Sequence, residues 1–184
     1  MLHLTIIIPE MYDEVNEEFI PEKRRILQLE HSLVSLSKWE SNWCKPFLSN
    51  NKPTHEETID YIKCMTITQN VDPDTYNYVT DEHVEIVNKY IANKMSATWF
   101  PDDKGAMRGG KINNEAVTSE LIYYWLISLN IPVKFEKWHL NRLLTLIRVC
   151  NAKNAPSKNM SQKAINNQYH SINEARKKAL HTKG

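Results

Sequence analysis

The sequence predicts a mainly α fold: a compact helical domain built on a central α-hairpin at about residues 118–151, with a short N-terminal β element and a C-terminal helix. Three observations support this prediction. Most apolar runs recur every three to four residues, which is the period of a helix that buries one face. The chain has 184 residues, 41% of them hydrophobic, so a core can form without disulfide or metal staples. At the N-terminus, Leu2–Ile8 alternates between apolar and polar residues and then becomes apolar, with several β-branched residues, which is typical of a β-strand.

The first elements are expected to be two strands and a helix. Leu2–Ile8 reads LHLTIII and is stopped by the proline that follows it. Residues 11–21 form an acidic stretch, and residues 25–31 fit a second strand. Ser32 then provides the N-cap for a helix that extends to Trp43.

Helix signals continue through the middle of the chain. Thr54 begins a T-x-x-E pattern, the capping box of a helix start, and this helix should extend to about residue 67. Residues 71–74 predict a turn around a proline. Thr80 or the residue after it should begin another helix, and residues 95–100 fit a short strand.

The next segment contains the predicted central hairpin. Residues 101–114 are polar and contain three of the four glycines, so we expect a surface loop. Thr118 or Ser119 should cap a helix over residues 120–130, which is apolar nearly all round and therefore predicted to lie at the centre of the core. A break at Ile131-Pro132 separates it from a helix over residues 136–151.

We expect one domain at residues 1–151 and a basic C-terminal arm at residues 152–184. Residues 151–160 resemble a linker. Ser161 caps a final helix to about residue 180, whose apolar stripe is thin: Ile165, Tyr169, Ile172, Ala175 and Ala179. Such a narrow apolar stripe gives a detached helix little stability. We therefore expect this helix to dock on the domain or on a partner.

The residues favour binding over catalysis. The sequence contains no P-loop, dinucleotide-binding fingerprint or nucleophile elbow, and its seven His lack the spacing of a zinc site. We therefore expect no enzyme, no cofactor and no metal. The three Cys share no CxxC spacing, which is typical of reduced thiols in the cytosol. The longest apolar run without charge, residues 121–133, is too short to span a bilayer, so no membrane partner is expected.

Charge is distributed unevenly, and this asymmetry predicts a binding surface. Residues 1–133 contain 12 Lys and Arg against 20 Asp and Glu, whereas residues 134–184 contain 11 against two. The candidate partner-binding surface consists of one tryptophan and the cations that follow it: Trp138, Arg142, Arg148, Lys153, Lys158, Lys163, Arg176, Lys177 and Lys178. Three interpretations stay open, namely an acidic protein surface (including this protein's own N-terminal part in a second copy), nucleic acid, and a solvated face. A protein partner is favoured, since no nucleic-acid recognition motif accompanies the charge.

Two stretches carry a resemblance to a known family. Residues 121–151 (LIYYWLISLNIPVKFEKWHLNRLLTLIRVCN) and the ending at residues 173–184 (NEARKKALHTKG) resemble small proteins encoded among the structural and tail genes of tailed bacteriophages. Residues 29–43 (LEHSLVSLSKWESNW) are similar more loosely.

The resemblance implies a tail assembly protein of the chaperone type. Such proteins are mostly helical, oligomerise, coat the tape measure protein and bring tail-tube subunits to it. We therefore expect a non-enzymatic phage protein that binds tape measure or tail-tube proteins in the cytoplasm of the bacterial host. The N-terminal strand and the acidic first part do not match this pattern. They leave open a component of the virion, or a nucleic-acid-binding or host-directed inhibitor that acts through the basic C-terminal segment.

Overall fold

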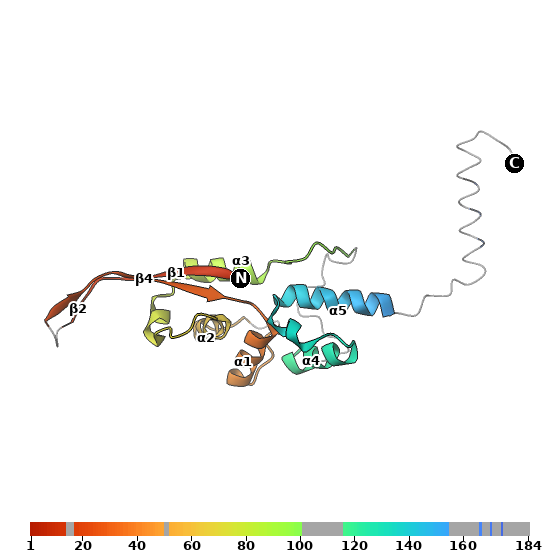
Figure 1. Ribbon diagram of the computed structural model, residues 1–184, viewed down its shortest axis with the longest axis horizontal. Coiled ribbons are helices and arrows are strands. Elements are labelled where there is room, and N and C mark those ends of the chain that lie inside the picture. The colour runs from red at the N-terminus through yellow and green to blue at the C-terminus, as the bar shows by residue number, and fades with distance from the viewer. Residues whose placement is uncertain are drawn as a thin grey trace. The chain divides into compact units, whose positions relative to one another are not determined.

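The fold is mainly helical, with N-terminal β-hairpins and a C-terminal helix (Figure 1). This computed structural model describes residues 1–13, 17–49, 52–100 and 116–154, together with Asn166, His170 and Glu174. The chain divides into two compact units, Met1–Asn151 and Ala152–Gly184. The surface loop expected at residues 101–114 and most of the expected final helix lie outside the described residues, although the three described residues of that helix, Asn166, His170 and Glu174, are helical.

One long hairpin forms the N-terminus. Strand β1 (Leu2–Ile8) pairs antiparallel with β4 (Lys23–Leu29), and β2 (Met11–Asp13) pairs with β3 (Glu18–Ile20). The paired residue numbers add to 31 in both ladders, so the two sheets share a single register. The hydrogen-bond ladder between the two strands is interrupted beside Pro9 and Pro21, because proline has no backbone N–H to donate. The hairpin extends beyond the helices, with β2 and β3 at its far end (Figure 1).

The hairpin is anchored by one apolar face. Successive side chains of a strand point to opposite faces, and here the buried set on β1 and β4 is Leu4, Ile6, Leu27 and Leu29. The second expected strand is therefore confirmed, with bounds two residues earlier than predicted. The C-terminal end of β4 is also tied to the segment after α2, because Ile67 N donates to Gln28 O at 2.8 Å.

Helices α1 (Leu33–Trp43) and α2 (His55–Met65) begin at the predicted caps. In α1 the Ser32 and Ser35 side chains each accept a hydrogen bond from the other residue's backbone N–H, at 3.3 and 2.9 Å. In α2, Glu57 N donates to Thr54 Oγ1 and Thr54 N donates to Glu57 Oε2, at 3.2 and 2.8 Å. Both helix starts are therefore confirmed, and α2 ends two residues before its predicted end.

The segment after α2 corrects two predictions. The predicted turn at residues 71–74 is the start of a longer 3-10 helix, η1 (Pro73–Tyr78), which buries Tyr76. Helix α3 (Asp81–Ile91) follows with Thr80 at its N-cap, as expected. Residues 95–100 do not form a strand, so that prediction is wrong; β4 already pairs with β1 and the segment after α2.

The C-terminal part of the first unit contains α4 (Ser119–Ser128), η2 (Val133–Lys137) and α5 (Leu140–Asn154). The predicted break at Pro132 is present, but the residues after it form a 3-10 helix. The final helix of this unit therefore begins at Leu140 rather than at residue 136. The predicted hairpin of two helices is thus interrupted by η2.

Two hydrophobic clusters make up the core. The first joins the hairpin to α2, η1 and α3, and includes Leu4, Leu27, Trp39, Ile62, Met65 and Val87. The second joins α1 to α4 and α5, and consists of Leu33, Leu36, Ile122, Leu126, Ile131, Leu140, Leu143 and Ile147. Helix α1 supplies side chains to both clusters, so it connects the β side of the molecule to the helical side.

The prediction that α4 lies at the centre of the core is wrong. Ile122 and Leu126 are fully buried, but Tyr124 is 63% exposed and Ile127 is 67% exposed. A helix that is apolar all round would normally be covered on every side. Here one apolar face of α4 remains on the surface of the described structure.

Candidate protein-binding surfaces

The end of the hairpin presents a pair of aromatic side chains to solvent. Tyr12 on β2 and Phe19 on β3 are directly opposite each other, with ring centroids 4.9 Å apart. They are 50% and 70% exposed, and Phe19 is the most exposed large hydrophobic side chain in the described part of the chain. We call Tyr12 and Phe19 the tip pair.

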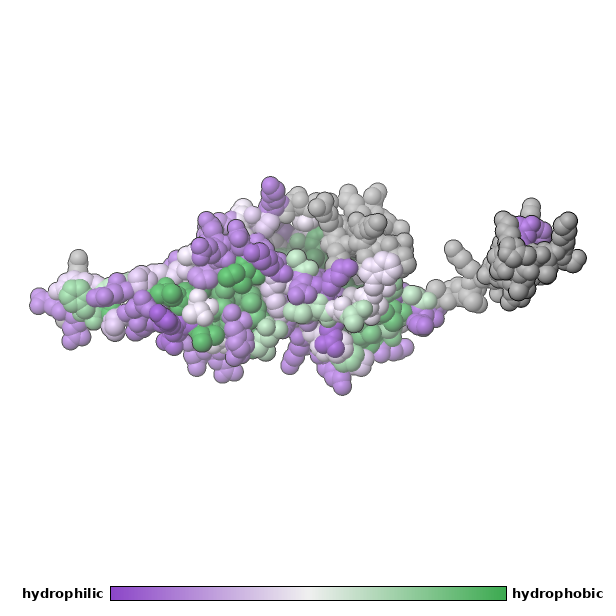
Figure 2. Space-filling view, turned by 90° about the horizontal axis from the view of Figure 1, so that it is seen from above, coloured by the Kyte–Doolittle hydropathy of each residue, from purple (hydrophilic) through white to green (hydrophobic). Residues whose placement is uncertain are grey.

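The tip pair has the properties of an interface anchor. A cross-strand aromatic pair stabilises a hairpin by only a few tenths of a kcal/mol to about 1 kcal/mol, and two exposed rings are rarely needed for that. Aromatic residues are enriched in the centres of protein interfaces. Hydrophobic patches also appear along the hairpin among hydrophilic residues (Figure 2), and Met11, Ile7 and Ile26 are exposed there.

A second apolar surface lies on α4. Its outward side carries Tyr124 and Ile127, and Val133 of η2 is also exposed. Contact between η2 and α4 is fixed by a hydrogen bond from Tyr123 Oη to Glu136 Oε2 at 2.9 Å. Burial and this hydrogen bond to a carboxylate raise the pKa of Tyr123 to about 12, so the phenol remains a donor at neutral pH.

A buried carboxylate holds α4 in place. Glu40 of α1 is 7% exposed, and its two oxygens accept backbone hydrogen bonds from Ser119 N at 2.7 Å and Phe47 N at 2.9 Å. The Ser119 N–H belongs to the first turn of α4, where helical N–H groups lack partners within the helix. Glu40 therefore fixes the start of α4 and, through it, the orientation of the exposed face.

Trp138 and Arg142, two predicted surface residues, are brought together. Trp138 follows η2, and its ring stacks on Phe135 with centroids 4.2 Å apart. The Arg142 guanidinium lies 4.1 Å from the centroid of the Trp138 ring, within the range of a cation–π contact. Trp138 is half-buried by these neighbours. The ring is therefore less exposed than a Trp anchor among cations would be, although a cation does lie beside it.

The remaining predicted cations divide into three groups. Arg148 stacks on Phe100, with its guanidinium 4.1 Å from the ring centroid. Lys153 is exposed in the last turn of α5. The other five, which lie outside the described residues, are Lys158, Lys163, Arg176, Lys177 and Lys178.

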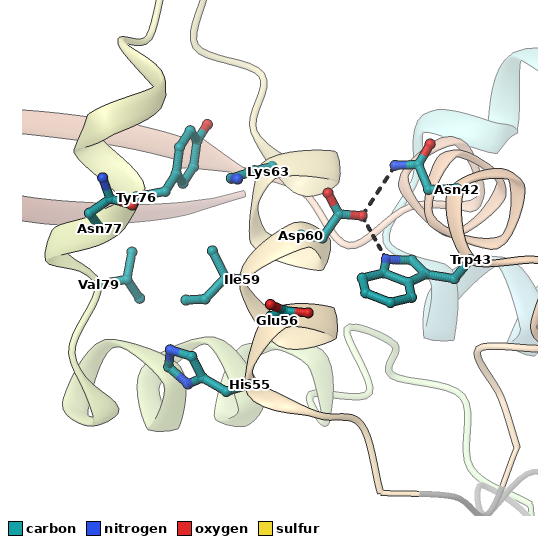
Figure 3. Close-up of a pocket in the computed structure, with 10 residues that line it drawn as sticks. All are labelled: Asn42, Trp43, His55, Glu56, Ile59, Asp60, Lys63, Tyr76, Asn77 and Val79. Carbon is teal, nitrogen blue, oxygen red and sulfur yellow. Dashed lines mark hydrogen bonds between the residues drawn. The ribbon is translucent and has the colours of Figure 1, made fainter.

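An open groove lies between α1, α2 and η1 (Figure 3), with a volume of about 660 Å³. The residues that line it are Asn42, Trp43, His55, Glu56, Ile59, Asp60, Lys63, Tyr76, Asn77 and Val79. Asp60 Oδ2 accepts hydrogen bonds from Trp43 Nε1 at 2.9 Å and Asn42 Nδ2 at 3.1 Å. Lys63 lies over the Tyr76 ring, 5.5 Å from its centroid. The groove thus combines apolar and charged groups on a surface fixed by three elements.

A pair of histidines joins the two sides of the core. His31 lies at the junction of β4 and α1, His139 precedes α5, and their ring centroids are 5.1 Å apart. His31 Nδ1 is hydrogen-bonded to Tyr61 Oη, and Leu140 N donates to His31 O at 2.7 Å. Burial, together with the neighbouring His139, lowers the pKa of His31 to about 3. Both rings are buried, so the pair serves packing between α1, α2 and α5 rather than an open site.

His139 carries one unpaired nitrogen. Its Nε2 is hydrogen-bonded to Tyr90 O at 3.1 Å, whereas Nδ1 has no partner among the described residues. Burial lowers the pKa of His139 as well. Both imidazoles are therefore held neutral at pH 7.

The described part of the chain contains no group of three or more His, Cys, Asp or Glu side chains positioned to hold a metal ion. None of its helices combines the length and apolar content that a membrane-spanning segment needs. Comparisons with protein-family models, curated proteins and solved structures found no match for this chain.

Sequence reasoning missed the tip pair, because residues 11–21 were interpreted as an acidic stretch. The sequence nevertheless contains a signal for this pair. Met11-Tyr12 and Phe19-Ile20 are equally distant from the hairpin centre set by β1 and β4, so extending the ladder in register would have paired the two aromatic residues.

Proposed function

We propose that the protein is a non-enzymatic phage protein that assists tail assembly by binding tape measure or tail-tube proteins. The observation that carries the proposal is the tip pair, which places two exposed aromatic rings at the end of a projecting hairpin. The family resemblance of residues 121–151 and 173–184 supplies the class of partner.

The exposed face of α4 supports the same function. Tyr124 and Ile127 are apolar groups that would normally be buried, and a helical partner could cover them by packing along α4. A partner that presents a helix suits this face. The first unit, whose core joins the hairpin to the helices through α1, would act as the rigid support for both surfaces.

Coexpression tests the proposal. The tagged chain should be produced together with the tape measure protein or the tail-tube protein of the phage that encodes it, and purified by its tag. We expect one of these proteins to copurify in a defined ratio, and not to be retained by the tag alone. If the chain elutes without either protein, the proposal fails. Retention of nucleic acid instead, lost steeply as salt is raised, would support the nucleic-acid-binding alternative.

A further inference from the structure

The groove between α1, α2 and η1 combines an apolar floor with an acidic margin. Ile59 and Val79 lie on opposite sides of it, and the rings of Trp43 and Tyr76 line its ends (Figure 3). Glu56 is exposed in the first turn of α2 and also lines the groove. An apolar floor with charged edges is the form of surface that receives one face of an amphipathic helix.

One oxygen in the groove is available as an acceptor. Asp60 Oδ2 is used by Trp43 and Asn42, whereas Oδ1 makes no hydrogen bond within the described residues. At the η1 side, Asn77 Nδ2 donates to Asp74 Oδ1 at 3.4 Å, which places a second carboxylate beside a groove residue. The carboxylates around the groove would therefore attract cations.

The elements beside the groove strengthen this charge. The segment that leads into η1 and forms it, residues 64–80, contains two acids and no Lys or Arg: Asp72 and Asp74. Among the residues that line the groove, Lys63 is the one Lys or Arg, and it lies over the Tyr76 ring. Lys45 lies over the Trp43 ring, 5.6 Å from its centroid, and its charge is paired with Glu57 at 2.6 Å. The ligand that fits this margin is a basic one.

The arm of this chain has the complementary properties. Residues 152–184 contain seven Lys and Arg against one Glu. The described residues Asn166, His170 and Glu174 are helical and exposed, and their spacing of four residues places them on one side of a helix. The sequence places Ile165, Tyr169 and Ile172 at the spacing of an apolar stripe. An apolar stripe flanked by cations matches an apolar floor flanked by carboxylates.

We infer that the groove is the docking site for the basic arm of a second copy of this chain. A second copy is indicated because α5 carries the chain away from α2 and η1, toward the opposite end of the first unit (Figure 1). Each copy then offers one groove and one arm, so the contact is of the head-to-tail type. The inference does not depend on the proposed function, because a self-associating chain need not bind tail proteins.

Two charge-reversed full-length variants test the inference. The groove variant is Glu56→Lys with Asp74→Lys, and the arm variant is Arg176→Glu with Lys177→Glu and Lys178→Glu. Both groove positions are exposed, and the arm variant leaves residues 1–151 unchanged. Sedimentation velocity at low salt should show concentration-dependent association of the natural chain. Each variant alone should remain monomeric: in the groove variant both surfaces are basic, and in the arm variant residues 152–184 carry four Lys against four Glu, so the arm is no longer attracted to the acidic groove.

Mixing the two variants gives the decisive result. In the mixture the unchanged basic arm of the groove variant can enter the unchanged acidic groove of the arm variant, so a 1:1 complex should form, at about the mass of a dimer. The matched control is Lys134→Glu with Lys137→Glu, which adds negative charge to η2 outside the groove and should leave the association of the chain intact. A mixture that stays monomeric would overturn the inference. So would a natural chain that shows no association, since the arm would then have docked within its own copy or not at all.

Discussion

Replacing Glu40 with alanine is expected to lower the free energy of unfolding by about 3 kcal/mol, because it removes the acceptor of two backbone N–H groups. Ser119 is 1% exposed, so its N–H cannot turn to water when the carboxylate is gone. The second N–H belongs to Phe47, in the loop after α1. Urea unfolding, followed by circular dichroism, measures the change.

Two further variants make this result specific. Glu40→Gln keeps the shape of the side chain but retains only one acceptor oxygen. We therefore expect it to lower the free energy of unfolding, but by less than Glu40→Ala does. Glu85→Ala removes an exposed carboxylate from α3 and should change stability by no more than about 0.5 kcal/mol. Hydrogen exchange at Ser119 N should also accelerate in Glu40→Ala. A Glu40→Ala protein within about 1 kcal/mol of the natural chain would contradict the role given to this carboxylate.

Lowering the pH from 7 to 5 is expected to destabilise the fold by about 2 kcal/mol through His31 alone. The pKa of His31 is about 3 in the folded protein and 6.5 in the unfolded chain. Between these values the unfolded chain binds more protons, so the free energy of unfolding decreases as pH falls below about 6.5. The lowered pKa of His139 acts in the same direction.

The matched variant is His31→Gln, which places an amide near Tyr61 Oη but cannot titrate. Its stability should decrease less between pH 7 and pH 5 than that of the natural chain, by a difference of about 2 kcal/mol. Paired urea titrations of both proteins at the two pH values give this difference directly. Equal pH dependence would mean that His31 is not the group that takes up the proton.

The parts of the fold that could be predicted are those set by local backbone chemistry. Ser32, Thr54 and Thr80 each precede a run with helical period, and each is found at an N-cap. Leu2–Ile8 alternates because one face of the hairpin packs on the helices. The N-cap residues and the strand alternation are signals set by residues close together in the sequence. In these segments the tertiary structure agrees with the local preference.

The parts that were missed depend on contacts between distant residues. The 3-10 helices η1 and η2 are short, and neither carries the period of a longer helix. Tyr124 and Ile127 are exposed because, among the described elements, α1 and α5 pack on the side of α4 that carries Ile122 and Leu126. Composition indicates how apolar a helix is, but it does not indicate how many neighbours cover it.

The candidate surfaces show the same division. Trp138 and Arg142 belong to the predicted surface and are four residues apart, a spacing at which side chains can meet, and the two side chains do stack. The contact of Arg148 with Phe100 joins residues 48 positions apart, which no local pattern indicates. The groove is assembled from α1, α2 and η1, so it was likewise beyond sequence reasoning.

The central claim is that the tip pair binds a tail structural protein, and an affinity measurement tests it most directly. The dissociation constant should be measured for the partner identified by coexpression, with the natural chain and with Tyr12→Ala/Phe19→Ala. Aromatic anchors in interfaces contribute about 2 kcal/mol or more, so the double variant should bind at least about 30-fold more weakly. Its melting temperature should stay nearly unchanged, because both rings are largely exposed. Unchanged affinity, with the same partner and the same melting temperature, would contradict the claim.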